Sequence, residues 1–289
     1  RELFMSWEKL IKENKPLVVT GTINAYSALL AERAGIKAIY LSGGGVANAS
    51  YGLPDLAMTS REDVLEDVRR IRSASDLPLL VDIDTGWGSA LSISRTIKEM
   101  ISAGASGVHI EDQVSEKRCG HRPNKEIVSC EEMVDRVKSA KDAQTDDNFL
   151  LMARTDAFAK GGLQEVIDRS NAFIEAGAGA IFPEAISTLK DYEEISKNVS
   201  KPILANITEF GMTPLFSHND LADAGVKIVL HPLSAFRAMS KAAEKVYATL
   251  ASSGDHEGLL DKMQTRDELY DVLDYHMYEE KIDKLFEKN

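Results

Sequence analysis

The sequence has few cysteines and little basic charge. Only Cys119 and Cys130 occur among 289 residues. Two cysteines are too few for a disulfide scaffold and favour a reducing compartment, so we expect a cytoplasmic protein. The 46 acidic side chains outnumber the 34 basic ones, which gives a formal net charge of −12. Because nucleic acids and anionic membranes are bound by basic surfaces, neither is an expected partner.

Long apolar runs and flexible linkers are also missing. No stretch approaches the roughly 18 uninterrupted apolar residues of a membrane span, and no linker rich in proline, glycine and serine divides the chain. Hydrophobic residues make up 44% of the chain and charged residues 28%, which excludes wholesale disorder. We therefore expect one domain over residues 1–289, a length that suits an α/β barrel.

What the sequence does contain is an alternation of short apolar runs with amphipathic stretches of helical spacing. Apolar runs without in–out alternation, separated by helices, are typical of a parallel sheet that is covered on both faces. Eight such units predict a (β/α)8 TIM-type barrel, and an open doubly wound sheet is the alternative. The eight predicted strands cover residues 17–20, 38–41, 79–84, 107–111, 149–154, 180–184, 203–206 and 227–230.

A repeated Ala-Gly pair supports the count of eight strands. Four predicted helices end in this pair, with Gly35, Gly104, Gly177 and Gly225 as the glycines. Each glycine suits the left-handed position that follows a helix, which a residue without a Cβ adopts freely. The intervals of 69, 73 and 48 residues each contain two strand and helix units.

Two helical segments lie outside the predicted barrel, which covers about residues 15–252. Residues 3–14 predict a helix that closes the N-terminal end of the barrel. A helix near 234–252 and an amphipathic C-terminal extension over about 255–289 give more helix than one barrel needs. The extension either packs on its own subunit or is exchanged between the subunits of an oligomer.

Polar side chains stand where nearly every predicted strand ends. Parallel barrels build their sites at the carboxyl ends of the strands. A single aspartate there is often only a helix cap, but several polar groups that converge on one barrel mouth indicate a site. The polar residues at or just after the ends of the predicted strands are Tyr40, Ser42, Asp82, Asp84, Glu111, Arg154, Glu184, Asn206, Thr208 and His231.

Asp82 and Asp84 predict a metal site. They are two residues apart in a predicted strand, so we expect both carboxylates on one face. Such a pair needs a cation, and oxygen ligands without nearby His or Cys favour Mg²⁺, with Mn²⁺ as a substitute. Glu111 is expected to orient a metal-bound water. A helix cap with a salt bridge is the alternative interpretation.

The glycine run that follows Ser42 does not have the spacing of a nucleotide site. No Gly-Lys-Ser or Gly-Lys-Thr follows Gly43, Gly44 and Gly45, and the dinucleotide-binding fingerprint is absent. The bare backbone N–H groups could still hold a carboxylate.

A long polar loop over about 113–129 carries the second candidate site. Loops of this length at a barrel mouth often act as lids. Cys119 lies there among basic side chains, which lower the pKa of a thiol, whereas Cys130 is followed by two glutamates. We therefore expect Cys119 to be the reactive cysteine. Its basic neighbours are Lys117, Arg118, His121 and Arg122.

Several segments resemble, in order, a known enzyme family. The resemblance covers about residues 4–286 and is to the 2-methylisocitrate lyases of the isocitrate lyase and phosphoenolpyruvate mutase superfamily. Its most specific segment is KRCGHRPNK, and DIDTGWG, with Trp87 in place of a phenylalanine, is a mild departure. The other matching segments are SGGGVANASYGLPDL, IEDQ, MARTDA, FPEA, LANITEFG and PLSAFRAM.

The resemblance implies a reaction and roles for individual residues. The family cleaves a tricarboxylate with a tertiary alcohol, 2-methylisocitrate, to pyruvate and succinate in propionate catabolism, using Mg²⁺. It implies Cys119 as general acid with His121 beside it and Asp55 as a further active-site acid. Tyr40 is our candidate for the base, because it is expected to point toward the barrel mouth. It also implies a homotetramer with exchanged C-terminal helices. The implied substrate-binding residues are Ser42, Gly43, Gly44, Gly120, Arg154, Glu184, Asn206, Ile207, Thr208, Arg237 and Arg266.

Related activities are the alternatives. An isocitrate lyase would give glyoxylate and succinate, but Phe182, Leu230 and Pro232 are expected to leave room for the substrate's methyl group. Cys119 argues against the phosphorus–carbon chemistry of the phosphonopyruvate branch, which resembles this chain but has asparagine in the loop. A non-catalytic barrel that binds carboxylates is the remaining alternative.

Overall fold

The computed structural model describes residues 6–117, 125–254 and 257–286. It divides the chain into two compact units, Arg1–Phe236 and Arg237–Asn289. Within the described ranges, no helix combines the length and the hydropathy that are needed to cross a bilayer.

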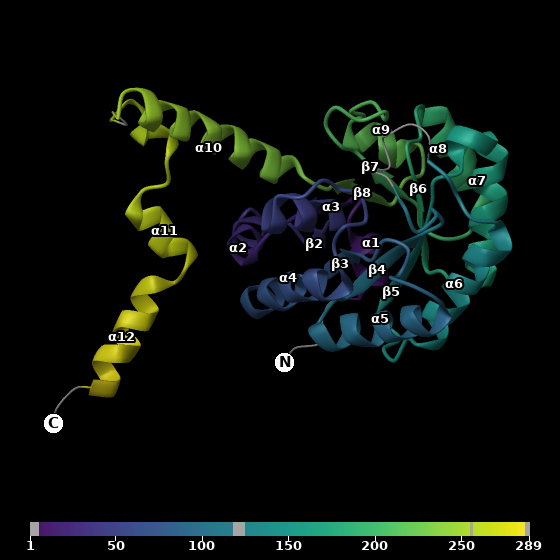
Figure 1. Ribbon diagram of the computed structural model, residues 1–289, viewed down its shortest axis with the longest axis horizontal. Coiled ribbons are helices and arrows are strands. Elements are labelled where there is room, and N and C mark those ends of the chain that lie inside the picture. The colour runs from purple at the N-terminus through teal and green to yellow at the C-terminus, as the bar shows by residue number, and fades with distance from the viewer. Residues whose placement is uncertain (1–5, 118–124, 255–256, 287–289) are drawn as a thin grey trace. The chain divides into compact units, whose positions relative to one another are not determined.

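The first unit is a barrel of eight parallel strands, as predicted (Figure 1). β1 pairs with β2 on one side and with β8 on the other. The ring is completed between β6 and β7 by a parallel bridge from Ile181 to Ile203. The strands are β1 Leu17–Gly21, β2 Ala38–Leu41, β3 Leu79–Asp82, β4 Gly107–Glu111, β5 Leu150–Thr155, β6 Ala180–Pro183, β7 Leu204–Asn206 and β8 Ile228–His231.

Helices surround these strands, and most of them begin at a capping side chain. Asn24, Ser60, Ser129 and Thr188 each accept a backbone N–H from the first turn of the helix that follows, which satisfies a donor that the helix itself cannot pair. The helices of this unit are α1 Trp7–Glu13, α2 Ala25–Arg33, α3 Gly43–Gly45, a π-helical turn Val46–Ser50, α4 Arg61–Ala74, α5 Ala90–Ala103, α6 Cys130–Asp142, α7 Phe158–Glu175, α8 Leu189–Asn198 and α9 His218–Asp223.

The four Ala-Gly pairs end helices as predicted. Gly35, Gly104, Gly177 and Gly225 have φ of +86°, +95°, +114° and +90°. All four lie in the left-handed region, so the backbone turns there from a helix into the next strand.

The apolar core has two layers. Side chains such as Tyr40, Leu80 and Phe182 fill the inside of the barrel, and a larger set packs between the strands and the outer helices. At the N-terminal end of the strands, Trp7 of α1 is buried and its Nε1 donates to the Ser106 carbonyl at 2.8 Å. The helix expected near this end of the chain is therefore present and closes that end of the barrel.

The second unit is helical. It contains most of α10 Ser234–Ser252, a 3₁₀ segment Glu257–Lys262, α11 Arg266–Val272 and α12 Tyr275–Phe286. No residue of α10 or α12 is buried. The predicted extra C-terminal helices are therefore present, and their exchange between subunits stays a prediction.

Candidate active site

Polar side chains are buried at or directly after the carboxyl ends of six barrel strands. Their burial distinguishes them from ordinary helix caps, which are solvated. They are Tyr40, Asp82, Glu111, Arg154, Glu184 and Asn206.

The aspartate pair meets in a way that differs from the prediction. β3 ends at Asp82, and Asp84 has a φ of +49°, so the expectation that both belong to one strand is wrong. A left-handed turn, not strand alternation, brings the carboxylates together. The backbone N–H of Asp84 donates to Asp82 Oδ1 at 3.0 Å. A Cβ placed on Gly43 would lie 3.1 Å from Asp82 Oδ2 and 3.2 Å from Asp84 Oδ1.

The glycine run passes directly beside these acids. The N–H of Gly43 donates to Asp82 Oδ2 at 3.1 Å. A Cβ on Gly44 would lie 3.0 Å from Asp55 Oδ2, so larger residues would crowd the carboxylate. The run therefore does hold a carboxylate through its N–H, and that carboxylate belongs to the protein itself.

Lys117 supplies positive charge to the same place. Its Nζ lies 2.6 Å from Asp55 Oδ1 and 2.8 Å from Asp84 Oδ1, and the side chain is buried. Burial opposes the charge of Lys117, but Asp84 and Glu111 raise its pKa well above the ordinary value. The sequence indicated Lys117 only as a basic neighbour of Cys119, and the structure joins it to Asp55 and Asp84.

The acids of this cluster have very different pKa values. Burial opposes ionisation of Asp82. The positive charges of protonated His109, Lys117 and Arg154 outweigh this effect and lower the pKa of Asp82 to about 2. Burial and the charge of Asp82 raise the pKa of Asp84 to about 7. Burial also raises the pKa of Glu111 well above its usual range.

Tyr40 and His109 form a pair inside the barrel. The Tyr40 hydroxyl lies 2.9 Å from His109 Nε2 and 3.5 Å from Asp82 Oδ2. Burial raises the pKa of Tyr40 well above its usual value and lowers the pKa of His109 to about 4. The phenol is therefore protonated and the imidazole neutral near pH 7. His109 was not among the residues expected from the sequence, although its spacing of two from Glu111 in β4 places both on one face.

Arg154 is the centre of a second buried cluster. Its guanidinium lies 3.3 Å from Glu111 and 3.2 Å from Glu184. It also donates from Nε to Asp156 Oδ2 at 2.9 Å, and Asp156 pairs with Lys125 at 2.5 Å. Lys125 was not expected from the sequence as a site residue, because its partner Asp156 lies 31 residues away in the chain. Asp156 is only two residues from Arg154, but the site residues expected from the sequence did not include it.

Further predicted residues lie around this cluster. Asn206 Nδ2 donates to Glu184 Oε1 at 3.3 Å, and Ile207 and Thr208 follow it as buried residues. Arg237 and Arg266 belong to the second unit. Cys119, Gly120 and His121 lie outside the described residues.

Cys130 behaves as the sequence predicts for an unreactive thiol. It is the first residue of α6 and is only partly buried. Burial raises its pKa; Arg169 opposes this effect, and the neighbouring Glu131 and Glu165 add to it. Thiolate chemistry near neutral pH is therefore disfavoured at Cys130.

The aspartate pair fits a hard cation by the chemistry of its donors. Among the described residues, no group of three or more His, Cys, Asp or Glu is arranged to hold a metal. However, three buried carboxylate oxygens have no hydrogen-bond partner in the described part of the chain: Asp84 Oδ1 and both oxygens of Glu111. Asp84 Oδ1 is in an ion pair with Lys117, and one Glu111 oxygen is in an ion pair with Arg154. Mg²⁺ is usually held by only one or two carboxylates and keeps several waters. Asp82 and Asp84 would suffice for such a site.

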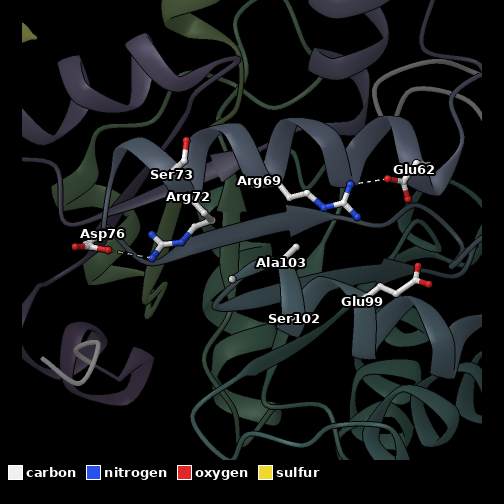
Figure 2. A pocket seen from close by; sticks show the side chains of 9 residues that line it. Glu62, Arg69, Arg72, Ser73, Asp76, Glu99, Ser102 and Ala103 are labelled. Atoms are coloured by element: carbon white, nitrogen blue, oxygen red, sulfur yellow. Dashed lines mark hydrogen bonds and ion pairs between the residues drawn. The ribbon is translucent and has the colours of Figure 1, made fainter. Parts of the chain in front are cut away.

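Two cavities lie away from these strand ends. One, of about 530 Å³, is lined by α4, α5 and the turns after them, where Arg69 pairs with Glu62 and Arg72 with Asp76 (Figure 2). The other, of about 940 Å³, lies by α1 and the segments that lead into the later strands. Neither cavity is lined by the clusters around Asp82 and Arg154.

Comparison with known proteins places the chain in a family. Residues 7–251 match the family model described as phosphoenolpyruvate phosphomutase. The chain is 60% identical over 282 residues to a 2-methylisocitrate lyase of Vibrio cholerae, covering 96% of this chain and 92% of the relative. It is 58% identical over 281 residues to the 2-methylisocitrate lyase of Escherichia coli, covering 97% and 95%.

A solved structure agrees with the sequence relatives. The phosphonopyruvate hydrolase in complex with oxalate and Mg²⁺ has a TM-score of 0.84 to this chain at 27% identity, covering 96% of this chain and 97% of that one. The family model matches the whole barrel, and the two lyases match almost the whole sequence. This chain therefore belongs to the phosphoenolpyruvate phosphomutase family.

Proposed function

We propose that this chain is a Mg²⁺-dependent carbon–carbon lyase that cleaves 2-methylisocitrate to pyruvate and succinate. The observation that carries the proposal is the 60% identity to a 2-methylisocitrate lyase over 96% of the chain. The buried carboxylates and guanidinium at the barrel mouth support it, because a tricarboxylate with a hydroxyl group needs both a cation site and anion-binding donors.

The chain's own donors would bind and orient the substrate. The Arg154 guanidinium is held rigidly between Glu111, Glu184 and Asp156. Held in this way, it is preorganised to bind a carboxylate without losing further conformational freedom. The other proposed contacts are Ser42, Gly43, Gly44, Gly120, Asn206, Ile207, Thr208, Arg237 and Arg266.

The metal would be held by Asp82 and Asp84, with Glu111 orienting a water. When bound, Mg²⁺ stabilises the negative charge that develops on the future pyruvate oxygen. Lys117 pairs with Asp55 and Asp84 and so balances only part of the negative charge in this cluster. A bound cation would balance more of it. Mn²⁺ is the expected substitute. The oxalate complex of phosphonopyruvate hydrolase contains Mg²⁺, which supports the same choice here.

Two proton transfers complete the cleavage. A base takes the proton of the substrate hydroxyl, the C–C bond breaks, and its electron pair passes to the succinate part, which is then protonated on carbon. Tyr40 is our candidate base. Burial raises the pKa of its phenol, while the charge of Arg154 acts in the opposite direction and favours the phenolate. His109 Nε2, 2.9 Å from the hydroxyl, orients the Tyr40 side chain.

Cys119 is the proposed acid that protonates the carbon, with His121 setting its charge state. Lys117 belongs to the same loop, two positions before Cys119 in the sequence, and is anchored to Asp55 at 2.6 Å. Asp55 would thus act on the loop through Lys117. A reactive thiol suits a reducing compartment, and we place the enzyme in the cytoplasm. We also propose a homotetramer.

Phe182 is the candidate residue for substrate selection. It is buried, with Arg154 5.2 Å above its ring and His109 packed edge-on at 5.1 Å. These contacts fix the ring beside the proposed carboxylate site. A methyl group in a pocket is worth about 1–3 kcal/mol, so selection against isocitrate would be about 10- to 200-fold.

The test is a direct assay of 2-methylisocitrate and isocitrate, with and without EDTA. We expect pyruvate and succinate from 2-methylisocitrate, a higher kcat/KM than for isocitrate, and loss of turnover with EDTA. A preference for isocitrate would favour the isocitrate lyase alternative. Mg²⁺-dependent binding without turnover of either compound would favour a non-catalytic barrel.

A further inference from the structure

A buried ion pair lies next to the end of β5, and the proposed reaction does not use it. Asp112 directly follows β4, and Arg169 belongs to α7. Arg169 Nη1 lies 3.2 Å from Asp112 Oδ2, and both side chains are buried. Neither is among the proposed substrate contacts, so any effect of this pair on the reaction has to pass through another residue.

Asp112 holds the end of β5 in place. Its backbone N–H donates to the Arg154 carbonyl at 3.2 Å. Its side chain accepts the Thr155 hydroxyl at 2.7 Å on Oδ2 and the Asp156 backbone N–H at 2.9 Å on Oδ1. One residue therefore fixes three consecutive residues at the end of the neighbouring strand.

The last of these three residues, Asp156, orients the Arg154 side chain. Arg154 Nε donates to Asp156 Oδ2 at 2.9 Å, and Nη2 donates to Oδ1 at 3.1 Å. A bidentate contact of this kind fixes the plane of a guanidinium as well as its position. The direction of the Arg154 guanidinium thus depends on where the backbone of Asp156 lies, and Asp112 holds that backbone.

Arg169 in turn keeps Asp112 in place. While Nη1 contacts the Asp112 carboxylate, Nη2 donates to the Val128 carbonyl at 3.1 Å. The N–H of Val128 donates to the Asp112 carbonyl at 2.8 Å. The guanidinium therefore joins the residue after β4 to the segment that leads into α6.

The energetics of such a pair favour a positioning role. Buried ion pairs seldom add stability, because the desolvation of two charges offsets their attraction, and apolar residues of similar volume are often as stable. Val166 and Phe173, on the same face of α7, fill this layer with buried apolar side chains. What Asp112 and Arg169 provide in the same layer, and apolar side chains would not, is a set of fixed hydrogen-bond directions.

We propose that Asp112 and Arg169 are positioning residues of the lyase reaction, which orient the Arg154 guanidinium through Asp156 for binding a substrate carboxylate. The inference rests on the proposed function, since Arg154 serves the reaction only by binding the substrate. Without Asp112, the guanidinium should take several orientations, of which a substrate carboxylate selects one. Because this loss weakens binding of the substrate and of the transition state alike, it should raise KM more than it lowers kcat.

The first test is a double-mutant cycle on kcat/KM for 2-methylisocitrate. Asp112→Ala should lower kcat/KM about 10- to 100-fold, mostly through KM. In an Arg154→Lys background, the same change should have a further effect of less than about threefold, because the group on which Asp112 acts is already lost. A purely structural role would instead lower kcat/KM by the same factor in both backgrounds.

Glu165→Gln is the matched control. Glu165 pairs with Arg169 Nε at 2.6 Å and its side chain is 40% exposed, so this change removes a partner of the same guanidinium but leaves Asp112 in contact with it. We expect wild-type kcat and KM. Circular dichroism checks the fold of every variant, and Arg169→Met replaces Asp112→Ala in both tests if that variant does not fold.

The second test needs no turnover. The Nε–H of Arg154 gives a side-chain resonance in ¹⁵N-labelled protein, which is assigned by its absence from Arg154→Lys. We expect this proton to exchange with water at least about tenfold faster in Asp112→Ala and at the wild-type rate in Glu165→Gln. Unchanged exchange in Asp112→Ala, or additive losses in the cycle, would show that the pair is only structural and overturn the proposal. If the wild type cleaves no tricarboxylate, the proposed function is wrong, and the exchange rate still decides whether Asp112 orients Arg154.

Discussion

Lys117 Nζ lies 2.8 Å from Asp84 Oδ1 in a part of the barrel mouth where both side chains are buried. The lysine thus supplies a positive charge where the proposed metal would supply another. An ammonium group and a divalent cation both stabilise buried carboxylates. Bound Mg²⁺ should therefore replace part of the stability that the charge of Lys117 gives to the folded protein.

Replacing Lys117 by methionine should destabilise the fold. Asp55 and Asp84 would lose their buried partner, and removing one member of a buried ion pair costs about 3–5 kcal/mol. We expect that loss in the free energy of unfolding by urea without metal, and partial recovery with Mg²⁺. Lys12→Met, on an exposed side chain of α1, is the control and should change stability by less than about 0.5 kcal/mol. An unchanged K117M stability would contradict the role given to this ion pair.

Asp82→Asn should remove the response to metal. The carboxylate accepts hydrogen bonds from Gly43 and Asp84, and an amide oxygen can keep only part of this role while losing the charge. We expect the rise in melting temperature caused by Mg²⁺ to disappear and kcat to fall at least about a thousandfold. Asp76→Asn, at a carboxylate that is 94% exposed, is the matched control. A wild-type metal response in D82N would place the metal elsewhere.

Cys119→Ser should abolish most turnover and leave the fold intact. A hydroxyl is a much weaker acid than a thiol, so protonation of carbon should slow by about 100- to 10,000-fold. Steady-state kcat and the circular dichroism melt measure the two effects. Cys130→Ser is the internal control, since burial raises the pKa of that thiol. If C119S turns over at the wild-type rate, the acid is another group.

Asp156 should contribute to stability in a pH-dependent way. Burial opposes its charge, but Arg154 and Lys125 lower its pKa below the ordinary value of 3.8. A lowered folded-state pKa gives stability that is fully present above the unfolded value and is lost as pH falls through the folded value. The difference in unfolding free energy between wild type and Asp156→Asn should therefore stay constant above about pH 5 and shrink below about pH 4. If this difference in unfolding free energy instead grew as the pH fell, the pKa of Asp156 would be raised in the folded protein and the prediction would be wrong.

The second unit should mediate oligomerisation. Its last helix exposes Ile282 by 55%, Leu285 by 67% and Phe286 by 77%. Exposed apolar faces of this kind are typical of subunit contacts. Light scattering should give a tetramer for the wild type, and Ile282→Asp should shift it toward smaller species, whereas Lys284→Gln should not. A monomeric wild type would refute the exchange of helices.

Local patterns in the sequence were enough to predict the barrel. Apolar runs marked the eight strands to within a few residues, and the Ala-Gly pairs marked four helix ends, because both depend on neighbouring residues and on burial. The closeness of the Asp82 and Asp84 carboxylates was also predicted, although the reason given, one shared strand, was wrong. The turn at Asp84, with its φ of +49°, was not predicted, because no glycine marks that position in the sequence.

The partners of the buried charges were decided only by the tertiary structure. Lys117 meets Asp55 across 62 residues, and Tyr40 meets His109 across 69. Such pairs depend on which strands and loops the closed barrel brings together at one end. His218 and His231 are closer in the chain, yet only the return of α9 to the end of β8 brings their nitrogens together. The sequence by itself determined the barrel and the kinds of groups at its mouth. Their pairing, and with it the pKa of each group, followed from the packing, because burial and distance set the strength of every charge.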